Sequence, residues 1–385
     1  MIKIFNKIIL FISLFIHIST YERYRDLIID GKTFNLKSSF LVEEDTEINE
    51  GSIISEALDD ITILVIKGQL TITPGRNISK IVKKNSVNGE VFHETDRYKY
   101  GLTSNIVAIG EKTKVVVNSA IIYVDCPFSN AIMAFNGAKI ILKNTTIITK
   151  SDYSKGVVVA YNANFEITDN SKIITEGNFS PCLEAYKNNN QAIFGTNIYL
   201  FSDGLGSPLI NNIGNAEVEI FVGIGKANNS QIMIMEEENQ VYLDSCEFSC
   251  NVKEIIEKEN PNLNSALNDA GIILYSKKGN AIDVIDLEFH HCKLKIENEE
   301  IVPIISCYNI QASITFEGTQ TEFKDIFIKA DKTKDSPIDS KIHLTLHNTY
   351  FKGKIIALEG SQIDLIADPN ILENGIEIEG KVDIQ

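Results

Sequence analysis

The segment Asp286–His291, with the sequence DLEFHH, is the best local group of acid, base and metal-ligand side chains in the chain. Side chains alternate across a β-strand, so Asp286, Glu288 and His290 share one face if this segment is a strand. Carboxylates beside an imidazole can transfer protons or bind a metal ion. The same composition also describes an ordinary solvated strand face, and we favour that interpretation because charged side chains are mostly exposed. These three residues are the candidate binding residues.

No catalytic residue and no metal site is identified elsewhere. His343 and His347 flank leucines on a second alternating segment and allow the same two interpretations. Cys246 and Cys250 form the one close cysteine pair, and they lack a histidine or a second pair at the spacing that zinc sites use. We therefore expect no cofactor.

Two columns of small polar residues organise the chain around these segments. Ser104, Ser129 and Ser154 recur at a spacing of 25 residues, and each precedes a short apolar run. Ser180 and Ser207 continue this series. The second column consists of Asn118-Ser119, Asn144-Thr145 and Asn170-Ser171, each followed by two isoleucines. A fixed period of this length is the signature of a stacked repeat.

The repeat unit predicts strands and no helices. Its apolar runs are short, rich in Ile and Val, and bounded by Asn, Gly, Ser and Lys. No helical stripe of apolar residues occurs between Ser104 and Cys250. The expected fold is all-β: a single right-handed parallel β-helix of roughly ten coils, each of about 25 residues.

The second column also predicts which side chains face the core. In each repeat a small residue stands two positions before an apolar one, so both point to the same side of a strand. The predicted inward pairs are Ser119/Ile121, Thr145/Ile147, Ser171/Ile173, Thr196/Ile198, Cys246/Phe248, Cys292/Leu294, Thr321/Phe323 and Thr349/Phe351.

Cys246 and Cys292 test this register. They are 46 residues apart, and subtracting the 19 residues of the insertion at 251–269 leaves 27, which is one coil. We therefore predict that they stack on adjacent coils. Stacked side chains point the same way, which is poor geometry for a disulfide, so free thiols are favoured over a bridge.

The chain divides into three parts. Residues 1–20 carry Lys3 and Lys7 before the apolar run Ile8–Ile18, which is the layout of a secretory signal peptide; an uncleaved membrane anchor is the alternative. Residues 21–100 are expected to form an N-terminal cap and the first coils. Residues 101–385 are expected to form the regular β-helix, with a protruding insertion at 251–269.

The net charge of −16 argues against nucleic acids and anionic membrane surfaces as partners. Nucleic acids and anionic membrane surfaces repel such a chain. Contact with a membrane is expected only through an uncleaved signal segment. We expect a secreted or cell-surface monomer.

Several stretches resemble secreted right-handed parallel β-helix proteins of the pectin-lyase-like superfold, which are often adhesin-like or carbohydrate-binding. The resemblance covers roughly residues 60–366, and is carried by residues 100–102, 136–159, 202–210 and 225–248. It implies a non-enzymatic protein that presents a lateral surface to an extracellular glycan or to another surface protein. The alternative is a polysaccharide-active lyase or glycoside hydrolase, although no paired-Asp or Gly-His-Gly arrangement typical of polygalacturonases is present.

Overall fold

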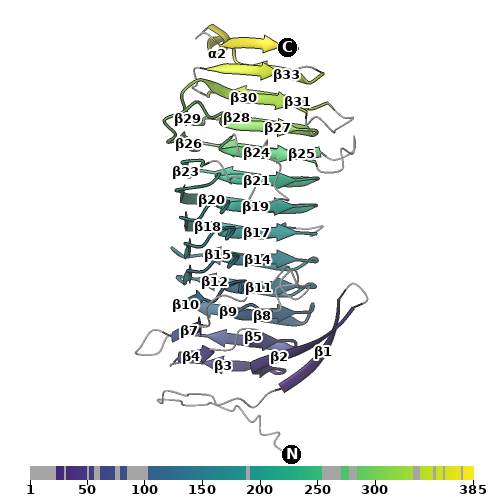
Figure 1. Ribbon diagram of the computed structural model, residues 1–385, viewed down its shortest axis with the longest axis vertical. Coiled ribbons are helices and arrows are strands. Elements are labelled where there is room, and N and C mark those ends of the chain that lie inside the picture. Colours follow the sequence, from purple (N-terminus) through teal and green to yellow (C-terminus); the bar gives the residue numbers. More distant parts are fainter. Residues whose placement is uncertain are drawn as a thin grey trace, which may run out of the picture.

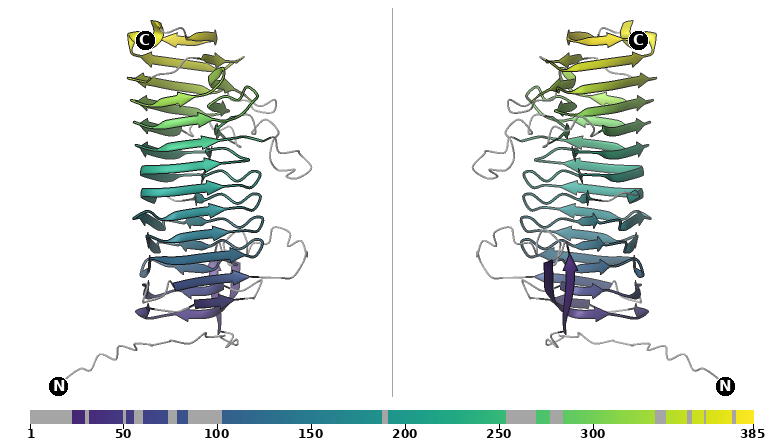
Figure 2. Two further views of the ribbon diagram at one scale, coloured as in Figure 1. Left: turned by 90° about the vertical axis from the view of Figure 1, so that its left-hand side faces the viewer. Right: turned by 90° about the vertical axis from the view of Figure 1, so that its right-hand side faces the viewer.

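The computed structural model describes residues 23–29, 32–49, 52–55, 61–73, 79–84, 103–187, 191–253, 270–276, 284–332, 339–349, 353–358, 360–373 and 376–385. Within these ranges the chain forms an all-β parallel solenoid of about 10 turns, as the sequence predicts (Figure 1). The predicted signal peptide, and residues 254–269 of the predicted insertion, lie outside the described residues. Figure 2 shows the coils rising one above another along a single axis.

One side of the solenoid, face A, is a 14-stranded sheet. Its first two strands pair antiparallel as a hairpin, and every later pairing is parallel. In order along the sheet, the strands are β1 (Arg23–Ile29), β2 (Lys32–Val42), β5 (Ile61–Val65), β8 (Ile106–Ile109), β11 (Ile132–Phe135), β14 (Val157–Ala160), β17 (Leu183–Tyr186), β19 (Ile210–Ile213), β21 (Met233–Glu236), β24 (Ile272–Tyr275), β27 (Ile305–Tyr308), β30 (Ile326–Asp331), β32 (Lys354–Ala357) and β34 (Glu377–Gly380).

Face B follows face A along each coil. Its strands are β3 (Thr46–Ile48), β6 (Gly68–Ile72), β9 (Thr113–Asn118), β12 (Lys139–Lys143), β15 (Asn164–Thr168), the first part of β18 (Gln191–Ser202), the first part of β20 (Ala216–Ala227), β22 (Asn239–Asp244), β25 (Val284–His290), β28 (Gln311–Glu317), β31 (Lys341–His347), β33 (Gln362–Ala367) and β35 (Val382–Ile384).

Face C closes the coil. It contains β4 (Ser52–Ser55), β7 (Ser79–Lys84), β10 (Ala120–Asp125), β13 (Thr146–Thr149), β16 (Lys172–Thr175), the second parts of β18 and β20, β23 (Glu247–Cys250), β26 (Lys293–Ile296) and β29 (Gln320–Glu322). The one helix in the described residues is α2 (Pro369–Glu373), so none there is long and apolar enough to cross a membrane.

The corner between faces B and C bends at one residue with left-handed backbone geometry. Asparagine tolerates this geometry, which explains Asn144 and Asn170 of the second sequence column. A residue with this geometry stands at the corner in nine coils: Ser119, Asn144, Asn170 (with Asp169 before it), Asn197, Val222, Ser245, His291, Gly318 and Asn348. Eight are polar or glycine; Val222 is β-branched, and a β-branched residue at positive φ is a genuine outlier.

The serine column lies in the core, and its last four serines, from Ser129 to Ser207, form a hydrogen-bonded stack. Ser104, Ser129, Ser154, Ser180 and Ser207 are all fully buried. The hydroxyl of each of the last three accepts a hydrogen bond from the backbone amide of the preceding serine, at 3.4, 2.8 and 2.9 Å. These hydrogen bonds give partners to buried backbone amides and hydroxyls that apolar side chains surround.

The predicted inward pairs are correct in four coils and out of register in three, and Phe351 of the last pair lies outside the described residues. Ile147, Ile173, Phe248 and Leu294 are buried as expected. In the first coil Ile122 is the buried neighbour of Ile147, whereas Ile121 points outward.

Two later pairs are also out of register. Ile198 is buried as predicted, but the register neighbour of Ile173 is Leu200, two residues further along. The neighbour of Leu294 is Thr321, which replaces Phe323. The inward neighbours from Ile122 to Leu200 lie 25, 26 and 27 residues apart, so a fixed period misplaces the column by one or two residues.

Candidate functional site

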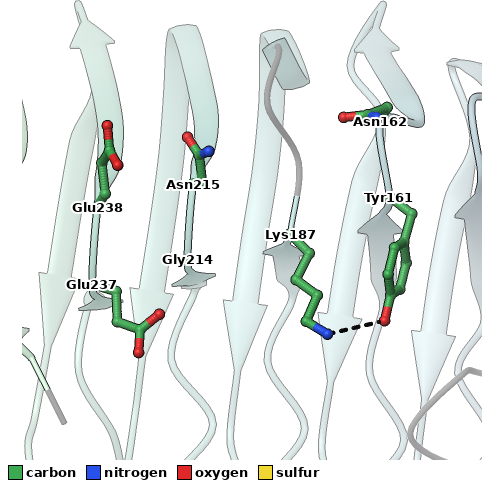
Figure 3. Close-up of a pocket in the computed structure, with 7 residues that line it drawn as sticks. All are labelled: Tyr161, Asn162, Lys187, Gly214, Asn215, Glu237 and Glu238. Atoms are coloured by element: carbon green, nitrogen blue, oxygen red, sulfur yellow. Dashed lines mark hydrogen bonds between the residues drawn. The ribbon is translucent and has the colours of Figure 1, made fainter. Parts of the chain in front are cut away.

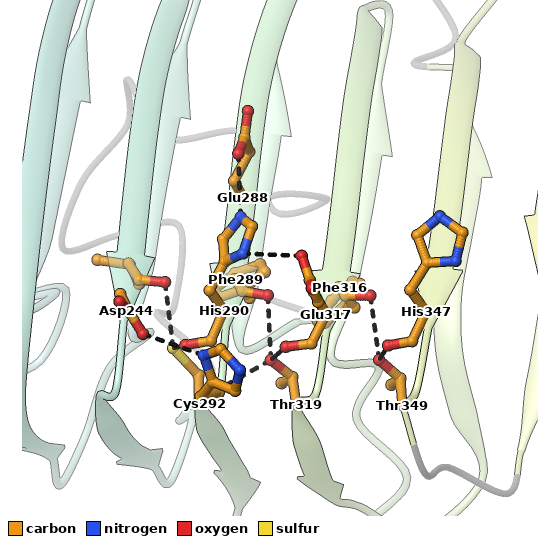
Figure 4. Close-up of polar contacts among 12 residues, drawn as sticks. Asp244, Glu288, Phe289, His290, Cys292, Phe316, Glu317, Thr319, His347 and Thr349 are labelled. Carbon is orange, nitrogen blue, oxygen red and sulfur yellow. Dashed lines mark hydrogen bonds and ion pairs between the residues drawn. The ribbon is translucent and has the colours of Figure 1, made fainter.

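Face B brings the three predicted residues to one surface. Asp286, Glu288 and His290 all point outward from β25, because Leu287 and Phe289 between them are fully buried in the core. Figure 4 shows His290 between Glu288 and the next coil's Glu317. Nε2 of His290 lies 3.1 Å from Glu288 Oε2, and Nδ1 lies 3.2 Å from Glu317 Oε2. The imidazole is therefore fixed by two carboxylates.

Asp286 lies nearer the start of β25, away from the His290 imidazole. Burial, and then the charge of Glu288, raise the pKa of the Asp286 carboxyl. It occupies the register position between Gln240 and Ser313 on the adjacent coils. No group of three or more His, Cys, Asp or Glu side chains in the described ranges is arranged to hold a metal ion.

The other histidines of this side bind neighbouring carboxylates singly. Nδ1 of His291 lies 3.4 Å from Asp244 Oδ1. His343 and His347 pair with Asp364 and Asp368, each at 3.2 Å. These contacts are exposed and match the expectation of solvated strand faces.

A row of aromatic rings leads away from His290 across three more coils. The ring of Tyr242 stacks on the His290 imidazole with centroids 4.9 Å apart. Phe221 follows at 5.4 Å from Tyr242, and Phe194 at 5.8 Å from Phe221. All four side chains are half-buried on the outer surface of face B. We call these four residues the aromatic run.

Rings and carboxylates alternate along both columns of outward positions. In one column the register order is Glu166, Phe194, Glu219, Tyr242, Glu288. In the other it is Thr196, Phe221, Asp244, His290, Glu317. Each ring of the run therefore has a carboxylate beside it on the next coil. The result is a checkerboard of apolar rings and hydrogen-bond acceptors.

Polar groups at the edge of the aromatic run are coupled to one another. The amide of Gln191 donates to Glu219 Oε2 at 2.5 Å. Burial, followed by a hydrogen bond with Glu219, raises the pKa of the Glu217 carboxyl. Burial, and then Asp244 and Glu288, raise the pKa of the Tyr242 phenol, so it stays protonated and can donate at neutral pH.

The sequence prediction found one end of this surface and missed the rest. The outward positions of the first parts of β18, β20 and β22 hold Phe194, Phe221 and Tyr242. The signal available in the sequence was aromatic residues at positions of a strand that face solvent. It could be recognised only with the correct register, which depends on an irregularity between Gln191 and Ile193.

A hollow of about 410 Å³ lies at the corner between faces A and B (Figure 3). Its lining residues come from four consecutive coils: Tyr161, Asn162, Lys187, Gly214, Asn215, Glu237 and Glu238. The Lys187 ammonium lies 3.3 Å from the Tyr161 hydroxyl and 5.2 Å from the centre of its ring. The hollow is polar and mixed in charge, and it is separate from the aromatic run.

A second aromatic stack has a structural role. Phe128, Tyr153 and Phe179 stack on consecutive coils at the corner between faces C and A, with centroids 4.8 and 5.0 Å apart. The first two rings are inclined by only 3° to each other. Ring faces stacked in this way cover one another, so they offer only edges to a ligand.

Cys246 and Cys292 lie on adjacent coils. They directly precede β23 and β26, which pair with each other, and the backbone amide of Lys293 donates to the Cys246 carbonyl at 2.7 Å. All six cysteines are buried and free. A hydrogen bond with Cys292, together with burial, raises the pKa of the Cys246 thiol, and the same bond lowers that of Cys292.

Comparison of the chain with protein-family models, curated proteins and solved structures finds no match. The resemblance to pectin-lyase-like proteins is therefore supported only as far as the parallel β-solenoid.

Proposed function

We propose that this protein is an exported, non-enzymatic binding protein that recognises an extracellular glycan through face B. The observation that carries the proposal is the checkerboard of the aromatic run with Glu219, Asp244, Glu288 and Glu317. Sugar rings present C–H groups on their faces and hydroxyls at their edges. Aromatic rings suit the former, and carboxylates and amides accept or donate hydrogen bonds to the latter.

The negative charge around the aromatic run favours neutral or amine-bearing glycans over acidic ones. Carboxylates surround the rings, and the whole chain carries a net charge of −16. A polyuronate would be repelled, whereas a neutral or amine-bearing glycan would not. The predicted residues Glu288 and His290 belong to this surface, and Asp286 lies at its edge.

Export and right-handed coiling belong to the same proposal. Lys3, Lys7 and the run Ile8–Ile18 support a signal peptide, and extracellular glycans require export. Nearly all parallel strand crossovers are right-handed, which supports the expected hand of the coils.

A glycan array with purified protein tests the binding function. We expect neutral or amine-bearing glycans to bind, and Phe221→Ala with Tyr242→Ala to reduce that binding at least tenfold, since each ring contributes on the order of 1 kcal/mol or more. The matched control is Phe201→Ala, an outward aromatic on face C, which should leave binding unchanged. Equal binding by the double variant and the wild type would overturn the assignment of face B.

The second candidate function is a polysaccharide-active enzyme, and the raised pKa of Glu217 beside Glu219 favours it specifically. A carboxyl whose pKa is raised beside a second carboxyl is an arrangement that acid/base catalysis uses. Glycan depolymerisation that is lost in Glu217→Gln and Glu219→Gln would establish this alternative. Binding without depolymerisation supports the binding protein.

A further inference from the structure

Face C carries an apolar stripe on its outer surface. The paired isoleucines of the repeat explain it: Ile147 and Ile173 point into the core, so Ile148 and Ile174 point out. The register aligns one outward apolar residue on each of six coils, namely Ile54, Val82, Tyr123, Ile148, Ile174 and Phe201. On the following coil the same position is Lys226, and the stripe ends. We call these six residues the apolar stripe.

A charged column borders the apolar stripe where the strands end. Lys84 and Asp125 are register partners, and the Lys150 amide donates to Val124 O, which places Lys150 beside Asp125. Lys150 forms an ion pair with Glu176 of the next coil. Along the axis the order is therefore Lys84, Asp125, Lys150, Glu176, with alternating sign.

We propose that the apolar stripe is the contact surface for a second copy of this chain, related by a twofold axis that runs along the strands between Tyr123 and Ile148. This operation reverses the coil order of the second copy. It places Tyr123 against Ile148, Val82 against Ile174 and Ile54 against Phe201, so each aromatic ring meets an aliphatic side chain. A surface that fits itself in this way is the requirement for a twofold dimer.

The same twofold axis also pairs opposite charges of the charged column. Coil reversal sets Lys84 opposite Glu176 of the second copy, and Asp125 opposite Lys150 of the second copy. Both pairs join opposite charges. A twofold axis parallel to the solenoid would instead set strand ends against strand beginnings and lose this match. The charges therefore select one of the two possible arrangements.

The contact is small, so the dimer is weak. Six coils at about 4.8 Å and strands of about 13 Å give roughly 380 Å² per copy, below the roughly 800 Å² of a standard interface. We expect a dissociation constant on the order of 100 µM and rapid exchange.

Sedimentation velocity over about two decades of concentration around 100 µM tests the proposal. We expect a reversible monomer–dimer equilibrium for the wild type. Ile148→Lys should abolish it, while Ile366→Lys, at an exposed isoleucine of face B, should not change it. Circular dichroism melts establish that each variant is folded. A wild-type protein that stays monomeric throughout the range, or an Ile148→Lys variant that dimerises normally, would overturn the proposal.

A charge swap tests the axis independently of the apolar contacts. Lys84→Glu and Glu176→Lys should each weaken association several-fold, and the two together should recover part of the loss, because the exchanged charges again face their opposites. Glycan binding by face B should be unaffected in all of these variants. Equal effects of the single and double changes would rule out this axis.

Discussion

The Ser180 hydroxyl accepts a hydrogen bond from the backbone amide of Ser154, one coil earlier, at 2.8 Å. The same hydroxyl is within hydrogen-bonding distance of the carbonyls of Ser151 and Asn178. The side chain is fully buried, so water cannot replace these contacts. One serine thus fixes the turn of its own coil and the spacing to the preceding coil.

We therefore predict that Ser180→Ala destabilises the protein by about 1–3 kcal/mol, since it leaves a buried amide without a partner. Urea unfolding measures the change. Thr146→Ala, at an outward and half-exposed position of β13, is the control and should cost less than about 0.5 kcal/mol. A similar loss of unfolding free energy in both variants would show that the hydrogen bonds of the serine column do not stabilise the protein.

Ile147 and Lys172 lie on adjacent strands and point to opposite sides of face C. Ile147 is fully buried between Ile122 and Ile173, whereas Lys172 is exposed. Ile147→Asp places an unpaired charge in the core and should cost several kcal/mol, enough to unfold the coils around it. Lys172→Asp should cost well under about 1 kcal/mol. Thermal melts that rank the two in the opposite order would contradict the strand alignment.

The sequence predicts the solenoid because the serine column and the asparagine column recur with the same period. The serines at 129, 154, 180 and 207 need the interior of a coil, and any slip would bury their neighbours in the wrong environment. The corner asparagines follow from left-handed backbone geometry, which few residues tolerate. Both requirements are local, so the sequence alone reveals them.

The aromatic run on face B could not be predicted in the same way. Its residues come together only through the register between coils of unequal length. Phe194 and Phe221 are 27 residues apart, whereas Phe221 and Tyr242 are 21 apart. They come together because they alternate between two columns of face B, as the strand pairings define. The sequence prediction selected only Asp286, Glu288 and His290, which alternate along one short segment and share one strand.

The stability of the last coils should depend on pH through Asp368. A hydrogen bond from the Asn348 amide at 2.6 Å, and then a contact with His347, lower the pKa of the Asp368 carboxyl. Its contribution is therefore present above the ordinary carboxyl pKa of about 3.9 and is lost as the pH falls through the lower folded value. We expect Asp368→Ala to destabilise the protein at neutral pH.

That difference should shrink toward zero as the pH falls below the lowered folded pKa of Asp368, because wild type and variant then both lack the carboxylate. Melting temperatures of the two proteins, measured across the acid range, check this. Asp383→Ala, in the exposed last strand, provides a control for the removal of one negative charge. A difference between wild type and Asp368→Ala that persists unchanged in acid would rule out the ionised hydrogen bond as its cause.

The buried thiols should be inert in the folded protein. Burial raises the pKa values of Cys182 and Cys250 to about 12, so almost no thiolate of these two forms near pH 8. The pKa of Cys292 is lowered, but its side chain is 2% exposed, so a reagent cannot reach it in the folded protein. We expect the native protein to resist iodoacetamide, and the denatured protein to take up six equivalents, one for each free cysteine. Fewer than six in denaturant without a reductant would reveal a disulfide, and Cys246 with Cys292 would be the first pair to map.

Val222 is the corner residue that fits its backbone geometry worst, and its replacement should stabilise the protein. Its φ of 58° matches that of Asn197 on the preceding coil, which is 54°. A β-branched side chain in this geometry costs about 1–2 kcal/mol, and asparagine carries a smaller penalty because its side chain can bond locally. The Val222 side chain is 52% exposed, so little apolar burial is lost on replacement.

We accordingly expect Val222→Asn to raise the free energy of unfolding by about 1 kcal/mol. Val218→Asn provides the control: it is fully buried in the same strand and should be strongly destabilising. Phe221 of the aromatic run directly precedes Val222, so glycan binding should be measured on the same variant. A stabilised Val222→Asn protein that binds glycan less well would mean that the strained corner sets the position of the Phe221 ring. A destabilised variant would contradict the strain itself.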